Sequence, residues 1–269
     1  MCNIRNIIGL FVLTGIVMAC ILVPLLSSPE NNYPKMDLMA QAPSWSHWMG
    51  TDMLGRDMLY RVCLGGRTTL LVALSAAALT SIIGVIYGMI MGLSPKWVSP
   101  AMMCMLQVFL SLPVILVAVA LRSIVEGSVI MVIAIVTVTS WMFMAHMVRD
   151  EFVRLNNQDF VHQSRTFGAN WLGRLCWHLL PNTLPIIVVI SALSVSWAVT
   201  LESTLSFLRL GIPQNIPTWG NILLEGYYAM PMGVWWMLAF PAGVLIFFAT
   251  LVNMLSDVAR DELNPRRQS

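Results

Sequence analysis

The chain has 269 residues, of which 58% are hydrophobic and only 10% are charged. A soluble domain carries roughly 25% charged residues, so this chain has too little charge to cover a surface that faces water. Its net charge of +2 is too small to favour nucleic acid as a partner. The composition therefore predicts an integral membrane protein whose solvent includes membrane lipid.

Six apolar segments are long enough to cross a membrane as helices. A span needs about 20 apolar residues, and helices are favoured because backbone polar groups in hydrocarbon must pair within the protein. The segments are residues 7–26, 68–93, 101–121, 128–148, 183–205 and 233–256. They predict an all-α integral membrane protein with about six transmembrane helices.

The first segment also has features of a secretory signal. Arg5 precedes the apolar run, and residues 17–20 loosely resemble a lipoprotein processing site. The apolar run nevertheless continues past Cys20 to residue 26, which is long enough to span a membrane. We therefore expect this segment to be retained as the first membrane helix.

The distribution of Lys and Arg sets the expected orientation, because these residues collect on the cytoplasmic side. With the N-terminus in the cytoplasm, nine of them lie inside and six outside. This favours two cytoplasmic termini, an extracytoplasmic loop (27–67), a five-helix core (68–256) with a cytoplasmic loop (149–182), and a cytoplasmic tail (257–269). Four aromatic residues then form a belt at the outer end of the sixth span, namely Tyr227, Tyr228, Trp235 and Trp236.

The second apolar segment carries three glycines at intervals of four residues. Gly84, Gly88 and Gly92 share one helix face, where small residues let a neighbouring helix approach closely. The spacing predicts a helix-packing seam, although it does not say which helix is the partner.

The loop 149–182 has the pattern of two short helices. Phe160, Ser164 and Phe167 fall at helical spacing on one face. Gly168 suits a left-handed turn after that helix, and Pro181 is expected to stop a second helix over 171–180 before Asn182 caps the fifth span. The pattern leaves two interpretations open: a helical pair on the membrane surface, or a docking element for a cytoplasmic partner.

Several motifs, in order and over most of the chain, resemble permease subunits of ABC importers. The loop matches the family's EAA loop at Arg165, Gly168, Ala169, His178 and residues 180–182. The other matches lie at residues 47–52, 54–57, 202–203, 205–208, 210–211, 219–221, 257, 260–261 and 264–266. The combination is similar to the dipeptide, oligopeptide and nickel branch, and to the shorter, C-type permease of that branch.

The resemblance implies that the cytoplasmic loop holds a coupling helix that docks on an ATP-binding subunit. The residues expected to take part are Asp159, Phe160, His162, Gln163, Ser164, Arg165, Phe167, Gly168, Ala169 and Pro181. Two departures stand out. The positions of the Glu-Ala-Ala triplet read His162, Gln163 and Ser164 here, and Arg209 stands where the family has glycine.

The resemblance also implies the assembly: a second homologous permease, two ATP-binding subunits and an extracytoplasmic substrate-binding protein in a bacterial cytoplasmic membrane. Small peptides, nickel or a metal chelate are the expected solutes. An exporter subunit is a less favoured alternative, because the long outer loop suits capture from a binding protein. A self-sufficient secondary transporter would need ionisable residues near the midplane, and most spans offer none.

No enzyme chemistry is expected in this chain. Its two lysines, Lys35 and Lys96, do not follow a phosphate-binding glycine pattern, so ATP and magnesium are expected in the partner subunits. The four histidines show no metal-ligand spacing and no catalytic set is evident, so we expect no bound cofactor or metal.

Glu202 is the most unusual single residue, since a charge within a span is costly. It lies near the outer end of the fifth span. We expect a gate or an intersubunit ion pair that involves Glu202 and, nearby, Arg209; the alternative is a carboxylate that reaches outer water.

Overall fold

The structure is a computed structural model that describes residues 4–95, 97–158, 177 and 179–262. Five helices are long and apolar enough to cross a membrane: α1 (Ile4–Leu26), α2 (Met58–Leu93), α5 (Val129–Asn156), α8 (Leu180–Phe207) and α10 (Trp236–Glu262). Over the described residues there is no β-strand, only one isolated bridge between Thr51 and Asp57. The predicted all-α membrane class is confirmed.

The third predicted span is a bent pair of helices. α3 (Val98–Leu110) and α4 (Val114–Ile124) meet at 76°, so the described residues contain six candidate spans only if this pair counts as one. Pro113 is the N-cap of α4. A proline disfavours helical geometry at the residue before it and removes a backbone hydrogen-bond donor, which favours a break in the helix at this point.

α2 begins at Met58, ten residues before the predicted segment at residue 68. Asp57 caps it, because its carboxylate accepts a hydrogen bond from the backbone N–H of Tyr60 at 2.9 Å. The helix therefore includes Arg61 and Arg67, which the prediction assigned to the preceding loop. Their charge kept them out of the predicted apolar segment, whereas the fold gives Arg61 two acidic partners, the buried Asp52 and the partly exposed Glu225.

α8 begins at Leu180, so the predictions that Pro181 stops a helix before the fifth span and that Asn182 caps this span are wrong. Leu179 is the N-cap, and Pro181 lies in the first turn of α8 rather than ending a helix. Proline is accommodated there because the first backbone N–H groups of a helix have no partner within the helix.

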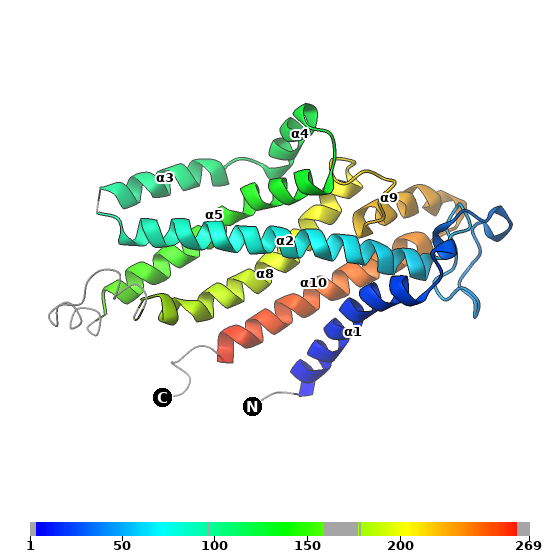
Figure 1. Ribbon diagram of the computed structural model, residues 1–269, viewed down its shortest axis with the longest axis horizontal. Helices are drawn as coiled ribbons and strands as arrows, with labels where there is room; N and C mark the ends of the chain where they lie inside the picture. Colours follow the sequence, from blue (N-terminus) through cyan, green and yellow to red (C-terminus); the bar gives the residue numbers. More distant parts are fainter. Residues whose placement is uncertain (1–3, 96, 159–176, 178, 263–269) are drawn as a thin grey trace.

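The two ends of the helix bundle differ (Figure 1). At one end, which we call the loop end, lie the connection 27–57 with its short helices η1 (Pro29–Asn32) and η2 (Met36–Leu38), the helix α9 (Trp219–Ala229) and the turn η4 (Met230–Met232). At the opposite, terminal end, α2, α5 and α10 finish and α1 and α8 begin. Both termini of the described chain therefore lie towards the same end.

α2 is the central helix of the bundle. It packs most extensively against α5 and then α8, while α10 packs on α8 and α9. α1 lies at the edge, against α2 and α10. The main core includes the fully buried Trp219, whose ring meets Phe248 of α10 edge to face.

The predicted aromatic belt is only partly exposed. Tyr227, Tyr228 and Trp235 are each more than half exposed, but Trp236 is buried. The indole N–H of Trp236 donates a hydrogen bond to the carbonyl oxygen of Thr51 at 3.0 Å. Trp236 therefore anchors the 27–57 connection to α10 instead of facing the membrane surface.

Candidate functional site

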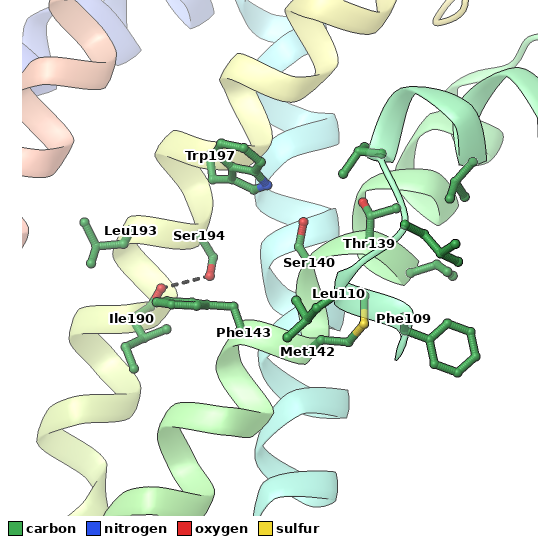
Figure 2. Close-up of a pocket in the computed structure, with 14 residues that line it drawn as sticks. Phe109, Leu110, Thr139, Ser140, Met142, Phe143, Ile190, Leu193, Ser194 and Trp197 are labelled. Carbon is green, nitrogen blue, oxygen red and sulfur yellow. Dashed lines mark hydrogen bonds between the residues drawn. The ribbon is translucent and has the colours of Figure 1, made fainter. Parts of the chain in front are cut away.

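An open cavity of about 490 Å³ lies among the break between α3 and α4, the middle of α5 and the middle of α8 (Figure 2). We call it the groove. Aromatic and aliphatic side chains form most of its lining, with Phe109, Leu110 and Val114 from the bent pair, Val138 and Phe143 from α5, and Ile190, Leu193 and Trp197 from α8. None of its lining residues is charged. Phe143 and Trp197 are each 53% exposed, so the groove offers apolar surface to a neighbour outside this chain.

Three hydroxyls and the indole N–H of Trp197 are the polar side-chain groups of the groove. Thr139 donates to the carbonyl oxygen of Ile135 at 2.8 Å, and Ser194 donates to that of Ile190 at 2.8 Å (Figure 2). The hydroxyl of Ser140 is buried and has no hydrogen-bond partner among the described residues. An unpaired buried hydroxyl costs free energy, so Ser140 is the lining group with most to gain from a partner that enters the groove.

The glycine-rich face of α2 lies against α5. A Cβ atom added at Gly84 would stand 2.6 Å from Cβ of Met144, and one at Gly88 would stand 2.6 Å from the carbonyl oxygen of Ala145. At Gly92 the distance to Cβ of Phe152 would be 2.8 Å. A larger residue in place of any of these glycines would push α2 and α5 apart. Such a shift would also affect the groove, because α5 carries part of its lining. The partner helix of this seam is thus α5.

Glu202 is fully buried near the loop end of α8. Its carboxylate accepts hydrogen bonds from the hydroxyls of Ser206, at 2.8 Å, and Ser203, at 3.4 Å. The hydroxyls of Thr69 on α2 and Thr218 before α9 also lie beside this carboxylate. Glu202 is therefore enclosed by its own chain. It reaches neither outer water nor a neighbouring subunit in this arrangement.

The hydroxyls of Thr69 and Thr218 accept hydrogen bonds from backbone N–H groups at the start of α9. Trp219 donates to Thr69 at 3.2 Å, and Asn221 donates to Thr218 at 3.1 Å. Each hydroxyl can thus accept from the backbone and donate to the carboxylate. Glu202 is the centre of a hydrogen-bond network that fixes α9 on α2 and α8. Sequence reasoning missed this network because Thr69 and Thr218 are far from Glu202 in the chain.

Arg209 lies apart from Glu202. No ion pair joins the two residues in the described part of the chain, and the guanidinium of Arg209 lies over the ring of Tyr228, 5.4 Å from its centroid. Arg209 has a φ of +61°, a left-handed conformation that favours glycine. This is the position at which the resembled family has glycine. The backbone turn is therefore kept despite the substitution.

The predicted coupling residues from Asp159 to Ala169 lie outside the described residues. Only Pro181 is described, in the first turn of α8. The segment connects the end of α5, at Asn156, with the start of α8, at Leu180. Both of these helices carry residues of the groove.

A second set of residues that sequence reasoning did not bring together lies at the loop end. Asp52, Arg56, Arg61 and Glu225 form an ion-pair network between the 27–57 connection, α2 and α9. Only Asp52 and Arg56 could be singled out from the sequence, because they belong to the resembled motifs. Glu225 belongs to none of these motifs.

The fold resembles that of a solved ABC transporter. A chain of the MetNI methionine ABC transporter, determined in inward-facing conformations, superposes with a TM-score of 0.65 at 18% identity. The superposition covers 77% of this chain and 98% of that chain. At this identity the likeness concerns the fold alone.

The chain belongs to the family of binding-protein-dependent transport system inner membrane components, whose family model matches residues 84–269. It is 35% identical to the dipeptide transport system permease protein DppC of Bacillus subtilis, over 96% of this chain and 81% of that protein. It is 32% identical to the oligopeptide transport system permease protein OppC of Escherichia coli, over 98% of this chain and 88% of that protein. The predicted membership of the ABC importer permeases is confirmed, and the chain is a multi-pass permease subunit.

Proposed function

We propose that this permease subunit forms one half of a path that carries small peptides into a bacterial cell. The observation that supports this most strongly is the similarity to dipeptide and oligopeptide permeases over nearly the whole chain. A path shared by many peptides cannot rely on one fixed charge, and an uncharged groove suits that need. Nickel and metal chelates, the other expected solutes, have no comparable support.

The groove is the proposed share of this chain in the path, with a second, homologous permease closing its open side. The exposed rings of Phe143 and Trp197 would then be covered by protein instead of lipid. The loop end would face outward towards the substrate-binding protein, and both termini would lie in the cytoplasm of a bacterial cell with a cytoplasmic (inner) membrane.

The energy would come from two partner ATP-binding subunits, which would hold the ATP and magnesium. Their docking segment is the loop with Asp159 to Ala169, between α5 and α8. Phe143 in the groove is 13 residues before the end of α5, a distance of about 20 Å along a helix. Because α5 and α8 are continuous from the groove to this loop, a displacement of the loop would move the groove walls directly.

Transport by the reconstituted complex tests the proposal. The permease pair, the ATP-binding subunits and the substrate-binding protein are placed in liposomes, and uptake of tritiated dialanine and of ⁶³Ni²⁺ is measured with and without ATP. We expect ATP-dependent peptide uptake that requires the binding protein. Uptake of nickel alone would overturn the peptide assignment, and uptake by this chain alone under an ion gradient would support a secondary transporter.

The coupling role is tested by Gly168→Val in the same complex. Gly168 is expected from the sequence to form a left-handed turn, and a β-branched residue there should disturb docking. We expect ATP hydrolysis to continue while peptide uptake is lost. Normal uptake by this variant would contradict the role assigned to the turn.

A further inference from the structure

Three buried hydroxyls on α2 and α5 have no hydrogen-bond partner among the described residues. They belong to Thr80 on α2 and to Thr137 and Ser140 on α5. Thr80 and Thr137 are 1% and 5% exposed, and the oxygen atom of Ser140 is buried as well. An unpaired hydroxyl is costly inside a membrane protein, where bulk water cannot satisfy it. Three of them on two packed helices therefore indicate a partner from outside the protein chain.

Other buried hydroxyls in the spans bond to their own helix. The hydroxyl of Thr183 donates to the carbonyl oxygen of Leu179 at 2.8 Å, and that of Ser256 donates to the carbonyl oxygen of Val252 at 2.8 Å. Serine and threonine in helices commonly make this bond to the carbonyl one turn earlier. The hydroxyls of Thr80, Thr137 and Ser140 do not make it. They are therefore available to a partner that lies between the helices.

The glycine seam places these three hydroxyls at one level of the bundle. The glycines of α2 and the carbonyls of α5 that they approach both advance by four residues: Gly84 with Trp141, Gly88 with Ala145, and Gly92 with Arg149. The same step towards the loop end pairs Thr80 with Thr137. The Cβ atom of Met144 also lies against Gly84, and four residues before Met144 is Ser140. Thr80 is therefore opposite both hydroxyls of α5.

The chemistry of this cluster suits a water molecule and not a cation. A hydroxyl can donate and accept a hydrogen bond, as water does, and a buried water typically makes about three such bonds. A cation would need a nearby negative charge to offset its desolvation. α2 carries no charged residue after Arg67, α5 carries none before His146, and α8 carries none before Glu202. The helices around the cluster thus offer no counter-charge.

Ser140 connects the cluster with the groove. The residue belongs to the groove lining, whereas its oxygen atom is buried (Figure 2). Small fluctuations of the helices are then enough for water to pass between the groove and the cluster. A bridging water is nearly as favourable as a direct hydrogen bond, and it can reorient when the two helices shift.

We propose that Thr80, Thr137 and Ser140 together bind one buried water molecule, which joins α2 to α5 beside the groove. The water gives each hydroxyl a partner, at an entropic cost smaller than the cost of three unpaired hydroxyls. The close-packed seam thereby gains one polar joint, at which α5 can shift along α2 without leaving a hydroxyl unpaired. The site does not depend on which solute the transporter carries.

Electron cryo-microscopy tests the site on the transporter purified with its native partners into lipid nanodiscs, at a resolution that shows ordered water. Choline replaces sodium and potassium in the buffer. We expect one density peak about 3 Å from all three hydroxyl oxygens, and Thr137→Val should lose it. Thr183→Val is the matched control, because it makes the same change at a fully buried hydroxyl that is bonded to its own helix. This variant should keep the peak.

Two results of this experiment would overturn the water site directly. One is the lack of a peak in the unmodified transporter, and the other is an unchanged peak in Thr137→Val. A peak that appears only when sodium is restored to the buffer would also overturn it, in favour of a cation.

A double-mutant cycle tests whether the hydroxyls share one water. Two groups that bind the same water are coupled, so the effects of Thr80→Val and Thr137→Val should be non-additive by about fivefold in the unfolding equilibrium constant. The purified chain is unfolded in detergent for this measurement. The effects of Thr80→Val and Thr183→Val should add. Additive effects of Thr80→Val and Thr137→Val would contradict a shared water.

Discussion

The loop end and the middle of the bundle are held together by different forces. At the loop end, Arg61, Asp52 and Glu202 are buried and meet charged or hydroxyl partners from other segments. In the middle, glycines let α2 and α5 touch along their backbones, and the groove beside them has no charged lining. Within a membrane water cannot satisfy a buried polar group. Polar contacts therefore fix the loop end. Close packing of helices fixes the groove walls, which would have to move during transport.

Arg61→Met should have the largest effect, because it removes the buried guanidinium that contacts both Asp52 and Glu225 and leaves two carboxylates with Arg56 as their remaining cation. Breaking a buried ion pair costs about 3–5 kcal/mol. Thermal unfolding of the purified chain in detergent measures the loss. Arg154→Ala is the control, since Arg154 is 48% exposed in its pair with Glu151 and its loss should cost under about 1 kcal/mol. Equal losses in both variants would show that burial of the network is unimportant.

Gly88→Ala should break the packing that holds the middle of the bundle. The added methyl group would stand 2.6 Å from the carbonyl oxygen of Ala145, so α5 has to shift, at a cost of about 2 kcal/mol. Gly243→Ala makes the same chemical change on α10 where the new atom meets nothing within 4 Å. Unfolding in detergent should show destabilisation of the first variant only. A stable Gly88→Ala protein would rule out the seam.

Glu202→Gln tests the hydrogen-bond network beneath α9. The amide nitrogen of glutamine cannot accept the hydroxyl hydrogen that the replaced oxygen accepted, so one buried contact is lost at a cost of about 1–2 kcal/mol. Relative to the unmodified protein, we expect amide hydrogen exchange to become faster in α9 but not in α5, as measured by mass spectrometry. An equal change of the exchange rate in the two helices would contradict a local role for Glu202.

Arg209→Gly should have the smallest effect and the opposite sign. Glycine removes the strain of a left-handed backbone at φ +61°, worth about 1 kcal/mol, although the contact with Tyr228 is lost. Arg209→Ala loses the same contact and keeps the Cβ atom, so it should not be stabilised. A higher unfolding temperature for the glycine variant alone supports this account, and equal unfolding temperatures for the two variants would contradict it.

The sequence predicted the membrane class, the approximate spans and the family, because each depends on local composition or on motifs. It was less accurate at the ends of helices. The start of α2 was placed ten residues late because Arg61 reads as an outer residue until Asp52 and Glu225 are seen beside it. The third span was expected as one helix, yet Pro113 separates two helices that meet at 76°.

Length, hydropathy and glycine spacing by themselves determined that this chain crosses a membrane and that one face of α2 packs closely. The tertiary structure alone decided that α5 is the partner of that face and that Glu202 lies enclosed by hydroxyls. It also decided that the groove exists, together with the cavity lined by Arg56 and Glu225 at the loop end. The physical reason is the range of the interactions. Hydrophobic length and helix periodicity act between neighbours in the chain, whereas each cavity and each buried polar network joins residues that only the packing of helices brings together.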